Sequence, residues 1–300
     1  MRMFGIRVSF AALTGLALLT LAACGSGTES QEQAARDNVD AMSREHADDS
    51  PTPGPGAEIA PERAVVTERL PYAEVNEELV YGHFVFPADM VEPLPAVIVI
   101  HEWWGLNEGV EAMADRIAAE GYIVLAVDLF GGKSAATPAE AREMMLRVVE
   151  NPELANENLR QAYDFVKNTA GAPRIGSLGW CFGGGWSLNT ALLFPDDLDA
   201  AVIYYGQVTA DDERLRPLNV PLLGIFAAED RGIPIESVQE FEAALERLRK
   251  DYEIRIFDGV GHAFANPSGS NYNAAAAEQA WQLTVEFLKA RLGTAAAGER

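Results

Sequence analysis

Hydrophobic and polar residues follow two different periods along the chain from about residue 61 onward. Short apolar runs of the kind found in buried strands are separated by longer segments with apolar residues at helical spacing. Strands are predicted at residues 79–87, 96–101, 122–128, 174–180, 200–206, 221–230 and 252–259. Helices are predicted at residues 110–121, 138–149, 153–169, 183–193, 235–250 and 274–292. This alternation predicts an α/β fold, with a mostly parallel central sheet flanked by helices on both faces.

The helix predicted at residues 138–149 begins with a capping box. Thr137 is a favourable N-cap residue, and Pro138 suits the first helical position. Glu140 is placed to reach back toward the cap.

The first 23 residues have the composition of a targeting segment. MRMFGIR contains two arginines and no acidic residue, and VSFAALTGLALLTLAA is an apolar run of 16 residues. Such a run is shorter than the roughly 20 residues of a membrane-spanning helix. Because it ends in small residues and Cys24, the segment resembles a bacterial lipoprotein signal peptide. The resemblance implies cleavage before Cys24, lipid on its sulfur, and an extracytoplasmic domain anchored in the cell envelope; an ordinary secretory signal is the alternative.

Residues 24–60 form a polar stretch between this segment and the periodic part of the chain. They are rich in Gly, Ser, Pro, Gln and acidic residues, and SPTPGPGAE (50–58) has linker composition. Such a sequence has too few apolar residues to offset the entropy of ordering, so a flexible tether is predicted. The folded domain is predicted at residues 61–292, and residues 293–300 are expected to be a frayed tail.

Composition narrows the classes of function. The chain has 300 residues, 48% of them hydrophobic, which suffices for one large core or at most two domains. With 23 basic and 45 acidic residues its formal charge is −22, which argues against nucleic-acid partners. The two cysteines are Cys24 and Cys181. If lipid occupies Cys24, Cys181 has no partner in the chain and is expected to be either buried or reactive.

Three polar residues directly follow predicted strands and form a candidate catalytic set. Cys181 stands in GWCFGGGW (179–186), Asp230 closes GIFAAED, and His262 follows YEIRIFDGVG. The order nucleophile, acid, histidine is that of the α/β-hydrolase fold. A helix N-terminus also stabilises negative charge on the nucleophile.

Each of these residues has an alternative. Cys181 alone is more often a core residue, but its glycine-rich strand-to-helix setting favours a nucleophile. Glu229 competes with Asp230 as the acid. The candidate base is His262 or His101, because His46 falls in the predicted tether and His83 in an early strand; His262 has the expected place after the acid.

HEWWG (101–105) begins like a zinc-protease motif but does not continue as one. Position 105 is Gly rather than His, and the run follows a strand, so no metal is predicted. In an α/β-hydrolase this position supplies an amide of the oxyanion hole. Glu102 is either part of the site or an ordinary surface acid.

Together, HEWWGLN, DLFGG (128–132), GWCFGG, the Asp230 loop and GHAF resemble the dienelactone hydrolase family over about residues 75–290. The family has the α/β-hydrolase fold and a Cys-His-Asp triad, matched here by Cys181, His262 and Asp230. The residue matched by Glu102 holds the resting cysteine and accepts its proton when substrate binds. The resemblance implies that the amides of Trp103 and Phe182 form the oxyanion hole and that the thiol attacks an ester or lactone.

The sequence departs from the family pattern beside the histidine. Members that act on dienelactone carry an arginine four residues after it for the substrate carboxylate; here the residue is Asn266, and Ala263 replaces the usual serine. The sequence therefore agrees as well with a neutral ester or lactone as substrate as with an anionic lactone. Trp104 and Asn266 are candidate substrate-binding residues, and Arg231 is a possible substitute anchor.

The sequence thus predicts an exported, lipid-anchored hydrolase of carboxylic esters or lactones that forms a cysteine thioester. Its partner is a small-molecule substrate, its only membrane contact is the N-terminal lipid, and it is expected to be a monomer. No cofactor is predicted, because no dinucleotide or phosphate-binding motif is present. The alternatives are a non-catalytic surface binding protein on this fold and a thiol redox protein, which would lack a resolving cysteine.

Overall fold

The computed structural model describes residues 33, 36–37, 39–47, 51, 61 and 63–293. The predicted signal peptide, Cys24 and residues 294–300 of the predicted tail lie outside the described residues. Within the described part, no helix combines the length and the apolar character needed to cross a bilayer.

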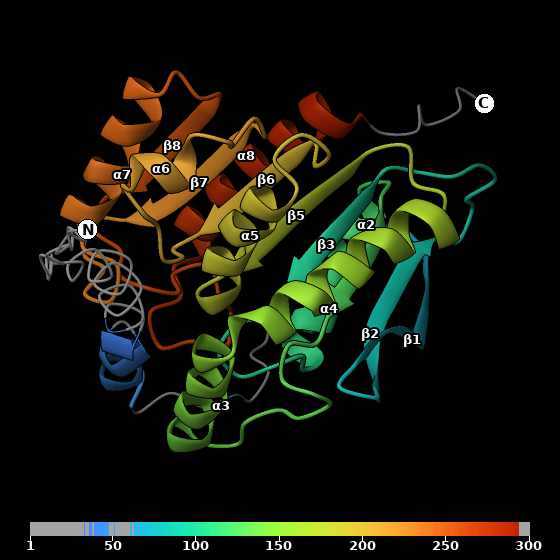
Figure 1. Cartoon of the computed structure of the whole chain (residues 1–300), viewed down its shortest axis with the longest axis horizontal. Helices are drawn as coiled ribbons and strands as arrows, with labels where there is room; N and C mark the ends of the chain where they lie inside the picture. Colours follow the sequence, from blue (N-terminus) through green and yellow to red (C-terminus); the bar gives the residue numbers. More distant parts are fainter. Residues whose placement is uncertain are drawn as a thin grey trace, which may run out of the picture.

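An eight-stranded sheet forms the centre of the molecule, with strand order β1-β2-β4-β3-β5-β6-β7-β8 (Figure 1). The strands are β1 (Val65–Val75), β2 (Glu78–Pro87), β3 (Ala96–Ile100), β4 (Ile123–Val127), β5 (Ile175–Trp180), β6 (Ala200–Tyr204), β7 (Leu222–Ala227) and β8 (Tyr252–Phe257). Strands β3 to β8 pair in parallel, whereas β1 and β2 form an antiparallel hairpin that pairs antiparallel with β4. The residues of β3 and β4 are all buried, as expected for strands covered on both faces.

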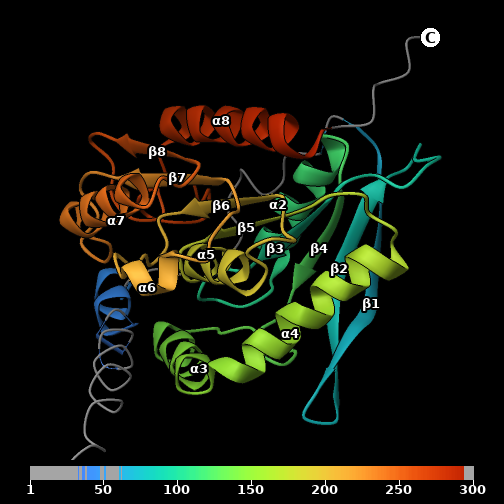
Figure 2. The ribbon, with the colours of Figure 1, turned by 45° about the horizontal axis from the view of Figure 1, so that its top comes forward.

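Helices cover both faces of this sheet, as Figure 2 shows. Helices α2 (Glu108–Ala119) and α8 (Ala274–Leu292) lie on one face, where Arg116 of α2 is ion-paired with Glu278 and stacks over Trp281 of α8. The opposite face carries α4 (Pro152–Asp164), α5 (Phe182–Leu193) and α7 (Ile235–Arg247). The remaining helices are α3 (Pro138–Glu150), which precedes α4, and the four-residue α6 (Asp212–Leu215). The predicted α/β-hydrolase architecture is thereby confirmed.

Most of the predicted elements are present, with ends that differ by a few residues. The helix predicted at residues 153–169 ends in a π-helical turn, Phe165–Thr169. At the start of α3, Thr137 accepts a hydrogen bond from the Glu140 amide, while the Glu140 side chain accepts from the amide of Ala136 rather than from that of Thr137. Strand β1 and helix α6 were not predicted, because β1 is mostly exposed and α6 has only four residues.

The flexible tether predicted at residues 24–60 is not what the structure shows at residues 39–47. Residues 39–45 are helical, and Val39, Met42 and His46 are buried. These three residues recur at helical spacing and form one face of the helix. The helix was not predicted because only one of its sides packs on the domain, so the segment as a whole remains polar.

The carboxyl ends of the parallel strands meet at one edge of the sheet. His101 follows β3, Cys181 follows β5, Tyr205 follows β6, and Asp230 lies three residues beyond β7. In open α/β sheets this edge is where working residues gather.

Candidate active site

Cys181 occupies a tight turn between β5 and α5, with φ 57° and ψ −119°. A side chain rarely adopts this region, so the turn is strained unless its surroundings hold it. The surroundings are backbone: a Cβ at Gly179 would lie 2.1 Å from the Gly183 carbonyl oxygen, and one at Gly183 would lie 2.2 Å from that of Ile100. The glycines of the predicted motif are therefore required because backbone atoms pack where side chains would start.

The turn presents Cys181 at the N-terminus of α5. The thiol is free, and the residue is 4% exposed. Its amide donates to the Tyr204 carbonyl at 3.0 Å, which fixes the turn to the end of β6. Phe182 is the first residue of α5, so its amide has no acceptor within the helix.

His262 and Asp230 form a buried pair from two different loops. His262 Nδ1 and Asp230 Oδ2 lie 2.7 Å apart, and neither side chain is exposed. The other Asp230 oxygen accepts hydrogen bonds from the amides of Gly232 at 2.8 Å and Ile233 at 2.7 Å. Glu229, the alternative acid, is exposed. The structure thus pairs the histidine with Asp230 and orients the carboxylate with backbone amides.

The electrostatic environment favours the protonated form of His262. Burial by itself would lower the pKa of His262, but the Asp230 carboxylate and the Cys181 side chain outweigh it and raise this pKa well above its ordinary value. The resulting contribution to stability is complete below the pKa of an unfolded histidine, about 6.5. It is lost as the pH rises through the higher pKa of the folded state.

The other candidate base, His101, has both ring nitrogens engaged. Nε2 accepts a hydrogen bond from the Leu129 amide at 3.1 Å, and Nδ1 therefore carries the proton and donates to the Glu102 carbonyl at 2.6 Å. Burial lowers the pKa of His101, which keeps the ring neutral. His101 therefore holds two loops together, and His262 is the histidine available at the site.

Glu102 and Asn266 are joined by a hydrogen bond of 2.6 Å from Asn266 Nδ2 to the carboxylate. The Asn266 side-chain oxygen accepts from the Ser268 amide at 2.8 Å. One N–H and the oxygen of the Asn266 side-chain amide are thus engaged within the protein. Glu102, Asn266 and Trp104 line a small cavity of about 40 Å³.

Trp103 and Phe182 lie on the two segments that meet at the turn. The packing of Gly183 against the Ile100 and His101 carbonyls brings the start of α5 against the segment that leads into Trp103. Trp103 is buried, with its ring 4.6 Å from that of Trp104, and the Phe182 ring stacks 5.8 Å from His101. The predicted oxyanion residues therefore lie on adjoining segments beside Cys181.

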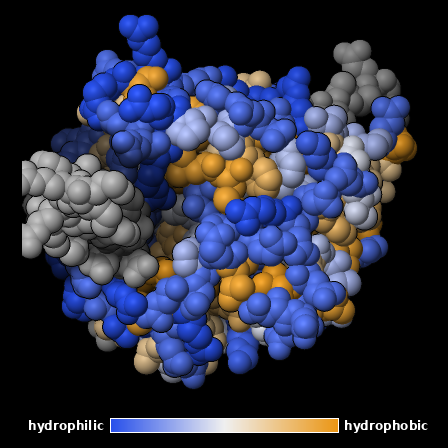
Figure 3. Space-filling model, viewed as in Figure 1, coloured by the Kyte–Doolittle hydropathy of each residue, from blue (hydrophilic) through white to orange (hydrophobic). Residues whose placement is uncertain are grey.

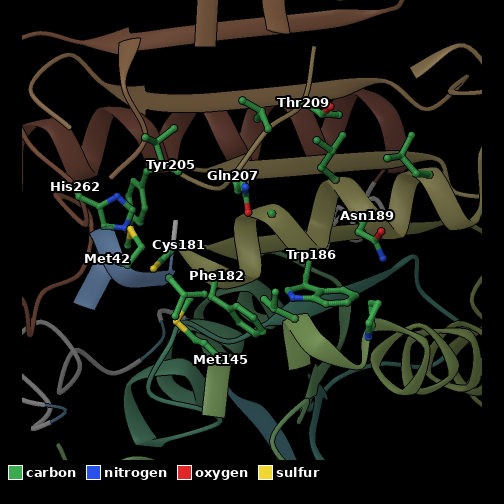
Figure 4. Close-up of a pocket in the computed structure, with 18 of the residues that line it drawn as sticks. Met42, Met145, Cys181, Phe182, Trp186, Asn189, Tyr205, Gln207, Thr209 and His262 are labelled. Carbon is green, nitrogen blue, oxygen red and sulfur yellow. The ribbon is translucent and has the colours of Figure 1, made fainter. Parts of the chain in front are cut away.

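A larger cavity of about 300 Å³ opens beside Cys181 and His262 (Figure 4). Met42, Cys181 and His262 lie together at one end of the view, with Trp186 and Asn189 farther along α5. Figure 3 shows hydrophobic residues gathered around a hollow near the middle of a largely hydrophilic face. Apart from His262 and Arg214, the described residues that line this cavity are apolar or uncharged. The nucleophile therefore borders a space suited to an apolar or weakly polar group.

Sequence reasoning missed two contributors to the site. Tyr205 lines both cavities, its ring lies 5.0 Å from His262, and its hydroxyl is buried without a hydrogen bond to any described residue. Burial, with Glu102 and Cys181 nearby, raises the pKa of Tyr205 well above its ordinary value. The helix that carries Met42 and His46 is the second. Two features of the sequence could have indicated these contributors. Tyr205 stands at the carboxyl end of a predicted buried strand, and Val39 and Met42 stand at helical spacing within the polar segment.

The DLFGG motif supports the site rather than entering it. The buried Asp128 carboxylate accepts hydrogen bonds from the amides of Phe130 and Gly132. The Phe130 ring lies 4.6 Å from His101 and 5.4 Å from Phe182. Asp128 thus shapes a loop that packs against the residues beside Cys181.

Gly183→Ala is expected to destabilise the protein by about 2–4 kcal/mol, because the new methyl group would overlap backbone that cannot move independently. Urea unfolding measures this. Gly185→Ala is the matched control in the same helix, since its methyl group would meet Gln207 at an ordinary 3.4 Å. Equal stability of the two variants would contradict the packing argument.

The arrangement combines a thiol at a helix N-terminus, a histidine oriented by a buried carboxylate, and amides on two adjoining segments. These are the parts needed for nucleophilic attack on a carbonyl and for proton transfer to and from the reacting groups. Among the described residues, no group of three or more His, Cys, Asp or Glu side chains gathers as a metal site.

Comparisons with known proteins identify the family. Protein usf of Aquifex pyrophilus is 34% identical over 204 residues, which cover 65% of this chain and 87% of that protein. A protein of Saccharolobus solfataricus, provisionally named carboxymethylenebutenolidase, is 31% identical over 68% of this chain and 92% of its own length. A solved structure from Klebsiella pneumoniae, provisionally named dienelactone hydrolase, shares the fold with a TM-score of 0.68 at 24% identity, covering 75% of this chain and 98% of its own. The model of the Dienelactone hydrolase family matches residues 81–292, and the chain therefore belongs to this family.

Proposed function

We propose that the protein is an exported, lipid-anchored hydrolase of carboxylic esters or lactones that acts through a thioester on Cys181. Membership of the dienelactone hydrolase family supports a hydrolase of this type. The observation that carries the mechanism is the strained turn that presents Cys181 to a cavity shared with the Asp230-oriented His262.

Acylation begins with the thiol of Cys181. Glu102 takes its proton when substrate binds, and the thiolate attacks the carbonyl carbon to form a C–S bond. The carbonyl oxygen becomes an oxyanion that accepts hydrogen bonds from the amides of Trp103 and Phe182. The ester C–O bond then breaks, and the departing alkoxide takes a proton from His262. The raised pKa of His262 supports this step, since it keeps the imidazolium populated.

Deacylation uses the neutral imidazole left by the first step. His262 removes a proton from water, and the hydroxide adds to the thioester carbonyl. The C–S bond breaks, the carboxylic acid leaves, and the Cys181 thiolate recovers its proton from Glu102. Asp230 stabilises the imidazolium that forms and fixes Nε2 toward the cavity, because it holds Nδ1.

The environment of Asn266 supports a neutral substrate. The side chain donates to Glu102 and accepts from Ser268, and as an uncharged amide it offers a substrate carboxylate no positive charge. A chain with a formal charge of −22 also repels anions at long range. We therefore propose a neutral ester or lactone as the substrate, with its less polar part in the cavity beside Trp186.

Export and lipidation rest on the sequence of residues 1–24. A basic start, an apolar run of 16 residues and small residues before Cys24 support a lipoprotein signal. Such a lipid would leave Cys181 as the single thiol of the mature protein, outside the cytoplasm.

Cys181→Ala is expected to lower kcat/KM for a chromogenic nitrophenyl ester at least about a thousandfold, because the nucleophile is lost. The full chain is used, since Val39 and Met42 line the cavity beside Cys181. Cys24→Ser is the matched control and is expected to retain turnover. A neutral dienelactone is expected to react faster than its carboxylate analogue. Full activity of the Cys181 variant would refute the mechanism, and a faster anionic lactone would refute the substrate class.

Asp230→Asn is expected to move the rising limb of the kcat–pH profile to lower pH. The Asp230 charge raises the pKa of His262 against burial, so its removal lowers that pKa and makes the neutral base available in more acidic solution. The maximal rate should fall about 10²–10⁴-fold, because the ring loses its orienting partner. Glu229→Gln is the matched control, because it removes a neighbouring exposed charge. It should leave the position of the rising limb and the maximal rate nearly unchanged. A limb that moves upward, or an equal loss in the control, would contradict the assignment of the acid.

A further inference from the structure

The helix at residues 39–45 packs its buried face directly on the catalytic groups. Val39 is 1% exposed, Met42 2% and His46 3%. The His46 ring lies edge-on to His262, 5.1 Å away, and 5.5 Å from Trp103. This one helix face therefore covers the proposed base and one proposed oxyanion residue together.

Met42 extends the contact to the loop of the acid. A Cβ at Gly232 would lie 2.5 Å from the Met42 sulfur, so the side chain rests against the backbone that holds Asp230. Glu45 lies in the same region: burial raises its pKa, and the neighbouring His262 and Asp230 charges act on it in opposite directions. The helix thus contacts the acid loop, the base and the turn after β3.

Two ion pairs tie this part of the chain to α3. Arg142 Nε donates to Asp40 Oδ1 of the helix at 2.7 Å, and Arg36, N-terminal to the helix, lies 2.6 Å from Glu150. All four side chains are at least 38% exposed, so each pair adds little stability and mainly fixes the position of the helix. Helix α3 also contributes Met145 and Val149 to the larger cavity. The ion pairs therefore join two elements that border the same space.

The N-terminal segment reaches both cavities that flank the reacting groups. Val39 and Met42 line the larger cavity with Cys181 and His262. Pro51 lines the smaller cavity with Glu102 and Asn266. A helix that merely packed on the domain could rest on any part of its surface, whereas this segment borders the site on both sides.

We propose that Val39 and Met42 form a wall of the substrate pocket and limit the size of the acyl group that Cys181 accepts. This inference rests on the proposed function and names specificity-determining residues for it. Their removal should enlarge the pocket next to the thiol, and a larger side chain at position 42 should narrow it. Compact acyl groups should be preferred to long ones in the intact chain.

The test compares Met42→Ala, Met42→Trp and the parent in the full chain carrying Cys24→Ser, so that Cys181 is the single thiol. Nitrophenyl acetate and octanoate report the acyl preference as a ratio of kcat/KM values. Alkylation of Cys181 by iodoacetamide and by pyrene maleimide reports access without turnover. Met42→Ala should raise the octanoate-to-acetate ratio and the relative pyrene maleimide rate about tenfold, and Met42→Trp should lower both.

Arg44→Ala is the matched control, because Arg44 is an exposed residue of the same helix. It should leave both ratios at the parent values. Opposite shifts from the two Met42 variants cannot arise from loss of folding. Unchanged ratios in both Met42 variants would overturn the inference even if the esters are cleaved. Altered alkylation without ester hydrolysis by any variant would instead refute the proposed function and uphold the pocket wall.

Discussion

The close approach of backbone at the turn after β5 is the constraint on which the site depends. Gly179 packs against Gly183, and Gly183 packs against the end of β3, so Cys181 is held at φ 57° where it would not otherwise stay. The same contact places the start of α5 beside the segment that carries Glu102 and Trp103. One steric requirement therefore fixes the position of Cys181 and brings together the amides that are proposed to donate hydrogen bonds to the substrate oxyanion.

The buried charges of the site are stabilised by neighbouring groups, although the chain as a whole is strongly acidic. The buried Asp230 accepts hydrogen bonds from two amides and pairs with His262, and its charge raises the pKa of His262, as the proposed protonation of a leaving group requires. Glu102 accepts a hydrogen bond from Asn266, an uncharged side chain at the position where dienelactone-cleaving relatives are expected to carry an arginine.

Much of this could be predicted from the sequence because parallel strands are marked by apolar runs and their carboxyl ends by the residues that follow. Cys181, Asp230 and His262 were predicted in that way, with His262 preferred to His101 by its place after the acid, and the hydrogen bonds of His101 agree with that preference. Strand β1 was not predicted, because most of its residues are exposed and it has no long buried apolar run. The helix at residues 39–45 was not predicted, because the segment around the buried Val39, Met42 and His46 has the average composition of a linker. The structure of both segments depends on their contacts with the rest of the domain, which local composition does not reveal.

Trapping the acyl-enzyme intermediate tests the proposed mechanism most directly. His262→Ala is mixed with a nitrophenyl ester, quenched in acid within seconds, and digested for peptide mass spectrometry. A cysteine thioester mechanism predicts an acyl group on the peptide that contains Cys181, because acylation can proceed from the thiolate while deacylation lacks its base. Released nitrophenol with no acyl group on that peptide, or with the acyl group on another residue, would contradict a cysteine thioester mechanism.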